Sequence, residues 1–167
     1  MSTRTAPDSS RRWQPLTGGT AVWVFMSVEV ITFGMFLLGH AWGWRTTPES
    51  HAAGQALLDV ESAVVSTFLL LLGSGFAYHA VLAEEDDRPQ RTVAMLFAAA
   101  ACGVAFSIHK IMEYQAPALA NVSLSTSSFW FSYLFLTGLH LFHVIGGVGL
   151  FGWVGVQTLR SPDHPNA

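Results

Sequence analysis

Four long apolar stretches, separated by short polar segments, constrain this chain more than any other feature of its sequence. A helix needs roughly 20 apolar residues to cross the hydrocarbon core of a bilayer, and each stretch reaches that length. Charged residues make up only 11% of the chain, against about 25% in ordinary soluble domains. The sequence therefore predicts an all-α, polytopic transmembrane helical bundle with about four spans.

The predicted organisation leaves little of the chain outside the membrane. We expect a polar tail over residues 1–19, a transmembrane helical domain over 20–160 and a C-terminal tail over 161–167. The spans are placed at about 20–40, 62–82, 92–114 and 129–159, with loops between them. The last stretch exceeds the thickness of the hydrocarbon core, and we interpret it as one long helix. A turn at Gly146-Gly147 would instead divide it in two.

The basic residues predict how the chain is oriented. Six of the eight Lys and Arg lie in the N-terminal tail, between the second and third spans, or at the C-terminus. Arg45 and Lys110 belong to the opposite side. Because cytoplasmic segments carry the excess of basic residues, we expect a multi-pass protein of the plasma (inner) membrane with both termini in the cytoplasm.

Small residues indicate where the helices pack. They are Ser62, Ser66, Gly73 and Ala77 on the second span, and Ala94, Ala98, Ala101 and Ala105 on the third. Small side chains let membrane helices approach closely, although they are also common in membrane helices without that role. The single cysteine, Cys102, excludes a disulfide or a cysteine-based metal site within one chain.

Several polar and ionisable side chains fall inside the predicted spans. They are Glu29 in the first span, His109, Lys110 and Glu113 in the third, and Thr137, His140 and His143 in the fourth. Each charge needs a partner, because a mid-span ionised side chain costs about 2.5–3.5 kcal/mol to insert. Glu113 follows Lys110 and His109 at spacings that permit contact on a helix. We interpret these residues as buried polar groups or lipid contacts, and none as catalytic or metal-binding.

Other functions compete with this structural interpretation. A haem or iron site would use His140 and His143, but no helix carries the Glu-x-x-His spacing of di-iron bundles. A proton path through Glu29 lacks a second carboxylate beside it, and the broken helices or inverted repeats of a carrier are not visible. We keep a self-standing haem-binding redox protein, and a small channel or carrier, as alternatives.

The fourth stretch resembles a known signature helix. Its aromatic start at Phe129 leads into Thr137, Gly138, His140, His143, Val144 and Gly147, a pattern similar to that of subunit III of the haem-copper oxidases. Three further segments agree in order. They are Ser27-Val28-Glu29-Val30, then Ser66-Thr67 with Leu70-Leu71 and Ser74-Gly75, then Lys110-Ile111-Met112-Glu113-Tyr114.

The resemblance covers about residues 27–159 and points to a short form. Nothing before Thr20 resembles the two extra N-terminal helices of long members. The Lys-x-x-Glu-Tyr variant is shared with members associated with nitric oxide reductase. Two features depart from the family pattern: Ser66 stands where Asn is usual, and the last helix of the family has no counterpart before Ala167.

The resemblance implies an accessory, non-catalytic membrane subunit of a respiratory haem-copper enzyme, either a terminal oxidase or a nitric oxide reductase. Such a subunit binds no haem or copper itself, packs against the catalytic subunit that holds them, and retains phospholipid. The family is associated with sustained turnover and proton uptake. The polar residues named above would then serve lipid or subunit contacts.

Overall fold

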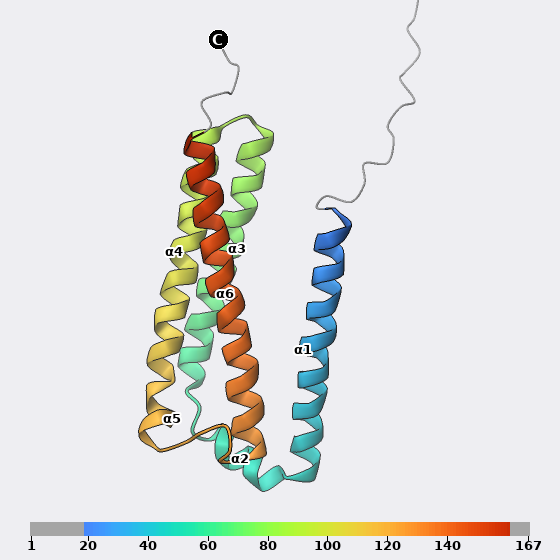
Figure 1. The fold of residues 1–167 in the computed structure, drawn as a ribbon. Coiled ribbons are helices and arrows are strands. Elements are labelled where there is room, and N and C mark those ends of the chain that lie inside the picture. The colour runs from blue at the N-terminus through green and yellow to red at the C-terminus, as the bar shows by residue number, and fades with distance from the viewer. Residues whose placement is uncertain (1–18, 161–167) are drawn as a thin grey trace, which may run out of the picture. The chain divides into compact units, whose positions relative to one another are not determined.

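The computed structural model describes residues 19–160, and in this range every regular element is an α-helix (Figure 1). Four described helices are long and apolar enough to cross a membrane by length and composition: Val22–Thr46, Val60–Glu85, Pro89–Leu119 and Ser128–Arg160. The expected all-α bundle of about four spans is therefore confirmed, and the chain is a multi-pass membrane protein. The tails expected at 1–19 and 161–167 lie outside the described residues, apart from Gly19.

The chain divides into two compact units, one ending at Gly39 and one beginning at His40. The first unit contains most of helix α1 (Thr20–Thr46). The helix continues six residues beyond the expected end of the first span, to Thr46. Its last turn carries Arg45, whose positive charge complements the partial negative charge of a helix C-terminus.

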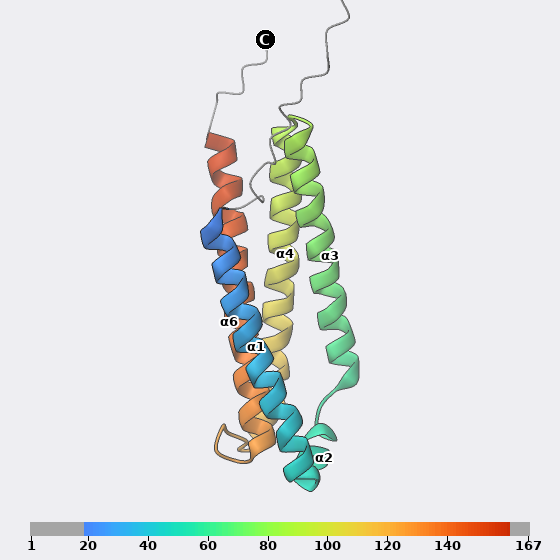
Figure 2. The same ribbon diagram turned by 90° about the vertical axis from the view of Figure 1, so that its right-hand side faces the viewer.

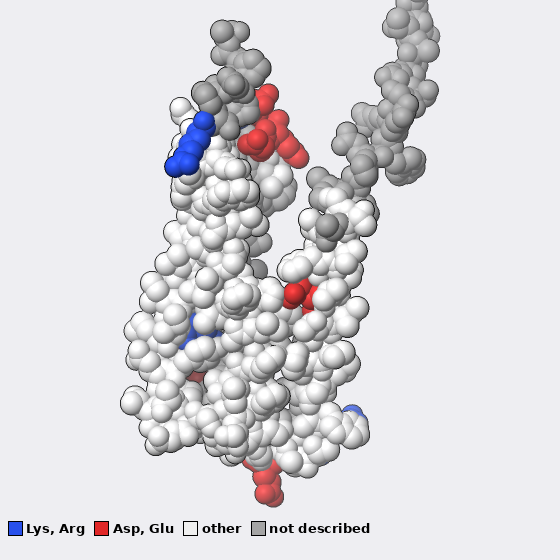
Figure 3. All heavy atoms as spheres, in the orientation of Figure 1, with Lys and Arg blue, Asp and Glu red and all other residues white. Residues whose placement is uncertain are grey.

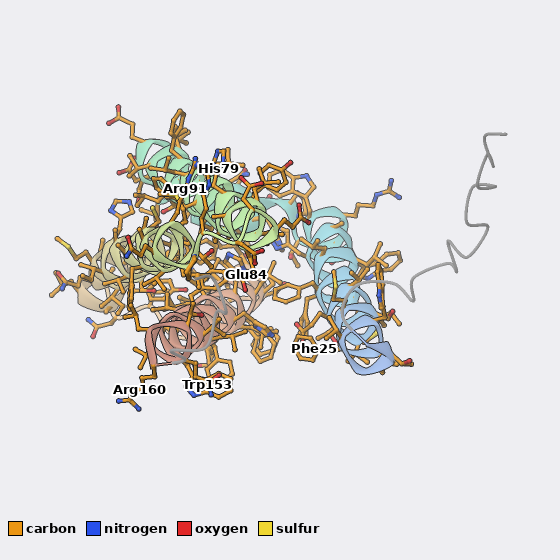
Figure 4. All side chains as sticks on the ribbon, turned by 90° about the horizontal axis from the view of Figure 1, so that it is seen from above. Phe25, His79, Glu84, Arg91, Trp153 and Arg160 are labelled. Carbon is orange, nitrogen blue, oxygen red and sulfur yellow. The ribbon has the colours of Figure 1, made fainter. Side chains whose placement is uncertain are left out.

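Three long helices form the second unit: α3 (Val60–Glu85), α4 (Pro89–Glu113) and α6 (Ser128–Arg160). Figures 1 and 2 show them side by side, and α4 packs along both α3 and α6. Helix α6 runs unbroken through Gly146 and Gly147, so the interpretation as one long helix is confirmed. From above, the side chains of Trp153 and Arg160 point away from α3 and α4 (Figure 4), and the indole is exposed.

Local sequence explains where α3 and α4 begin and end. Asp59 caps α3, because its side chain accepts a hydrogen bond from the Glu61 backbone N–H at 2.9 Å. The turn between α3 and α4 places Asp87 at a φ of 51°, a conformation that Asp tolerates better than most residues. Pro89 then opens α4, where its missing N–H costs nothing. Acidic side chains of this turn form the red group at the upper end of the bundle in Figure 3.

Two short helices occupy segments that the sequence analysis expected to be loops. Helix α2 (Pro48–Gln55) follows α1, and α5 (Gln115–Leu119) follows α4. Helix α2 has eight residues and α5 has five. Segments this short do not show a hydrophobic periodicity that would identify them as helices. Only the packing of α2 against α6 reveals that the α2 segment is part of the core.

Two of the four small residues singled out on α3 are buried, whereas none of the four on α4 is fully buried. On α3, Ser62 and Ser66 are buried. On α4, Ala94, Ala101 and Ala105 are exposed and Ala98 is half-buried. The buried residues of this helix are Thr92, Val93, Leu96, Ala99, Ala100, Gly103 and Phe106. Helix α4 turns its Gly103 side toward α6, because the two helices approach closely there and a Cβ added to Gly103 would overlap the Val148 side chain of α6. The glycine position, rather than the alanine stripe, sets the face of α4 that meets α6.

Candidate functional site

A partly buried carboxylate, that of Glu113 at the end of α4, is the centre of a cluster of polar side chains in the second unit. Its Oε1 accepts hydrogen bonds from Lys110 Nζ at 2.7 Å and from the Tyr133 hydroxyl at 2.6 Å. Its Oε2 accepts a hydrogen bond from Ser62 Oγ at 2.9 Å. Three donors from α3, α4 and α6 therefore converge on one side chain, and such charge-assisted bonds are the strong ones.

Ser62 joins His109 to the carboxylate. Because the Ser62 hydroxyl donates its one proton to Glu113, it accepts from His109 Nε2, which lies 3.0 Å from Ser62 Oγ. The hydrogen-bond network thus places a hydrogen on Nε2 of His109. The same nitrogen lies 3.3 Å from the Ser62 carbonyl oxygen. His109 and Glu113, four residues apart on α4, meet through a residue of α3 and not directly.

Lys110 is held on three sides. Besides its ion pair with Glu113, its Nζ donates to the Tyr133 hydroxyl at 3.2 Å. Nζ also lies 5.3 Å from the centre of the Tyr133 ring and 5.5 Å from that of the Tyr114 ring, within range of a cation–π interaction. The side chains of Lys110 and Glu113 are only 11% and 15% exposed, so this pair is shielded from water far more than a surface salt bridge.

A second link ties α4 to α6. The Tyr114 hydroxyl donates to Thr137 Oγ1 at 2.7 Å, and Thr137 Oγ1 donates in turn to the Tyr133 carbonyl at 2.6 Å. The hydrogen bonds of Thr137 are thereby divided between its own helix and a neighbouring one. We refer to Ser62, His109, Lys110, Glu113, Tyr114, Tyr133 and Thr137 as the polar cluster.

A cavity of about 420 Å³ adjoins the polar cluster. Ser62, His109, Glu113 and Tyr133 line it, together with Asp59 and Glu61 at the start of α3. A second cavity, of about 320 Å³, lies further along the bundle among α3, α4 and α6, with Gly73, Gly103, Val144 and Gly147 in its walls. The first cavity has polar and apolar residues in its walls, and the second is a mostly apolar groove between the helices.

The remaining residues singled out from the sequence lie elsewhere. The His140 ring meets the Phe106 ring edge to face at 5.8 Å, and His143 Nδ1 lies 2.7 Å from the Leu139 carbonyl of its own helix. Glu29 lies on α1 in the first unit and is partly exposed. Within residues 19–160, no three His, Cys, Asp or Glu side chains gather in an arrangement that would hold a metal ion.

The structure thus brings together four of the seven predicted residues, namely His109, Lys110, Glu113 and Thr137. From the sequence, Ser62 was expected only as a small packing residue, and Tyr133 had no assigned hydrogen bond. Tyr114 likewise had no hydrogen-bonding role. The available signal was that ionisable side chains such as Lys110 and Glu113 need polar partners on facing helices when they lie within a span.

Comparison with known proteins gives one distant relationship. No protein-family model matches the chain. It is 27% identical over 135 residues to the protein named "Heme-copper oxidase subunit I+III" of Aeropyrum pernix. The match covers 77% of this chain but 16% of that protein, so the chain spans about one sixth of the length of this relative. The relationship supports a distant similarity to haem-copper oxidase subunits.

Proposed function

We propose that the chain is an accessory, non-catalytic membrane subunit of a respiratory haem-copper enzyme, of the subunit III type. The observation that carries the proposal is the distant relationship to a "Heme-copper oxidase subunit I+III" protein along most of this chain. The motif from Thr137 to Gly147 supports the subunit III part of the proposal. The partner is then the catalytic subunit of a terminal oxidase or a nitric oxide reductase, which holds the haem and copper.

The polar cluster has a structural role in this proposal. Its donors and acceptors are matched across α3, α4 and α6, so it fixes the mutual register of the three helices without any added group. Buried polar groups that are satisfied in this way favour one arrangement of helices, because any slip leaves a charge without its partner. A rigid bundle offers the catalytic subunit a surface that does not rearrange on binding.

Phospholipid is the second partner in the proposal. The groove of about 320 Å³ has mostly glycine, alanine and aliphatic side chains from α3, α4 and α6 in its walls, together with Ser74 and Phe151, and this mainly apolar surface suits an acyl chain. The proposed setting is the plasma membrane, with both termini in the cytoplasm, and the proposed contribution is to assembly and sustained turnover. His140, His143 and Glu29 are proposed to contact lipid or the partner subunit.

Affinity purification of the tagged full chain from its native membrane tests the proposal. We expect a haem-copper catalytic subunit to co-purify, with haem absorbance that follows that subunit through further separation. The chain purified alone is expected to be colourless. Recovery without any haem-copper subunit would refute the proposal, and a Soret band that stays with the isolated chain would favour a self-standing haem protein.

A pair of variants then tests the role of the polar cluster within the complex. Glu113→Ala is expected to lower the yield of assembled complex, whereas Glu84→Ala, an exposed position at the other end of the bundle, is expected to leave it unchanged. Equal yields for both variants would show that the cluster has no part in assembly.

A further inference from the structure

The short helix α2 carries a wholly buried imidazole, that of His51. His51 is 0% exposed and is the largest wholly buried side chain of the described residues. Its ring is surrounded by three others, with centroid distances of 5.2 Å to His40, 5.8 Å to Trp44 and 5.6 Å to Phe129. Because these residues belong to the end of α1 and the start of α6, the ring of His51 connects three helices at one end of the second unit.

Hydrogen bonds fix the protonation state of this ring. His51 Nδ1 lies 3.0 Å from the Thr47 carbonyl and 3.3 Å from Thr47 Oγ1. The Thr47 hydroxyl donates its own proton to the Gly43 carbonyl at 3.0 Å, so both Thr47 oxygens act as acceptors and Nδ1 carries the hydrogen. His51 Nε2 is buried and has no hydrogen-bond partner among the described residues. The packing therefore accommodates the neutral ring.

Two glycines allow the close packing around α2. A Cβ added to Gly43 would lie 2.9 Å from both Cε1 and Nε2 of His51, so the imidazole packs directly on the α1 backbone. A Cβ added to Gly54 would overlap the Phe129 ring, so α2 also packs directly against α6. With both contacts in place, α2 packs closely against the end of α1 and the start of α6.

A second proton on His51 would place a positive charge and an N–H group where no acceptor is available among the described residues. The neighbouring rings offer some cation–π attraction, but the loss of hydration of a wholly buried charge is the larger effect.

His40 is the titratable group that faces the His51 ring, and its Nδ1 is bonded to Ser132 Oγ at 2.8 Å. The nearby charged residues of α1 and α2, Arg45 and Glu49, are exposed. From α6, Phe129 and Ser128 face this region, and neither titrates in the physiological range.

We propose that His51 is a pH-sensitive latch for α2. The neutral ring holds α2 against α1 and α6, and uptake of a proton at Nε2 releases it. The segment that follows α2 is affected as well, because Leu57, Leu58 and Asp59 line the cavity beside the polar cluster. Release of α2 at low pH therefore loosens one wall of that cavity. This inference does not depend on the proposed partner subunit.

Hydrogen–deuterium exchange of the purified full chain tests the latch. Backbone protection of residues 48–58 is measured at about pH 7.5 and about pH 5.5, with correction for the intrinsic exchange rate. Free imidazole takes up a proton near pH 6.5, and if only the released state of α2 allows this, the released population should rise about tenfold between these conditions. Unchanged protection of this segment in the wild-type protein would overturn the proposal without any variant.

Three variants assign the effect to His51. His51→Phe keeps an aromatic ring but cannot take up a proton, and it is expected to abolish the pH dependence. His40→Gln is expected to retain it, as is His79→Phe, which changes an exposed histidine of α3 near the opposite end of the bundle (Figure 4). If His40→Gln abolishes the pH dependence while His51→Phe retains it, His40 is the sensor and the proposal is wrong.

Discussion

Replacement of Glu113 by alanine removes the acceptor on which three helices converge. The variant loses hydrogen bonds from Lys110, Tyr133 and Ser62. Hydrogen bonds within membrane proteins average about 0.6 kcal/mol each, so these bonds alone account for about 2 kcal/mol. The loss also leaves Lys110, only 11% exposed, without its counter-ion. An uncompensated buried charge costs about 3–5 kcal/mol, and the charge therefore dominates the expected loss.

Lys110 lies near the end of α4, so its long side chain can extend toward the interface and recover part of this cost. We therefore expect Glu113→Ala to lose about 3 kcal/mol in the free energy of unfolding, at the lower end of that range. The measurement is reversible unfolding in mixed detergent micelles, followed by tryptophan fluorescence. Trp130 is a suitable reporter, because its ring meets the Tyr133 ring at 5.8 Å.

A double variant separates the charge from the lost bonds. Lys110→Met combined with Glu113→Leu removes both members of the ion pair, so no charge is left unpaired. We expect this protein to be more stable than Glu113→Ala by at least about 1 kcal/mol, since apolar replacement of a buried pair is often neutral. If the double variant instead loses the sum of the two single variants, Lys110 and Glu113 are not energetically coupled and the reasoning fails.

Three further changes test the packing and the capping. Gly103→Ala should cost about 1–3 kcal/mol by overpacking against Val148 of α6, and Gly54→Ala should do the same against Phe129. Gly152→Ala is the matched control for both, because a Cβ there meets nothing within 4 Å and should leave unfolding unchanged or slightly stabilise α6. Asp59→Ala should cost about 1 kcal/mol through loss of the α3 cap, seen as faster amide exchange in the first turn. Equal stability of the Gly103 variant and its control would contradict the close packing of α4 on α6.

The polar cluster and the latch differ in how they satisfy buried polar groups. In the cluster, the hydroxyls of Ser62 and Tyr133 both donate and accept, as Ser62 does between His109 and Glu113. At the latch, one nitrogen of His51 is satisfied and the other is not. A satisfied network resists change, whereas a half-satisfied imidazole responds to pH, because protonation alters the number of partners that it needs.

The sequence by itself determined the membrane-spanning character of the chain. Lengths of apolar residues decide this, since every backbone group in the hydrocarbon core has to be bonded within a helix. The sequence also placed Lys110 and Glu113 at a spacing that permits contact, because residues three apart on one helix are neighbours, and the two side chains form an ion pair. These conclusions depend on local geometry, which the order of residues specifies directly.

Tertiary structure decided everything that depends on which faces meet. The alanine stripe of α4 looked like a contact surface, yet α4 turns its Gly103 side toward α6, because the match of glycine to Val148 depends on both helices at once. Ser62 became the link between His109 and Glu113 only when α3 was set beside α4. His51 gave no periodic signal in a short polar segment, and its burial follows from residues of α1 and α6 that close around it. A contact between distant segments depends on the residues of both segments, so it cannot be inferred from either segment alone.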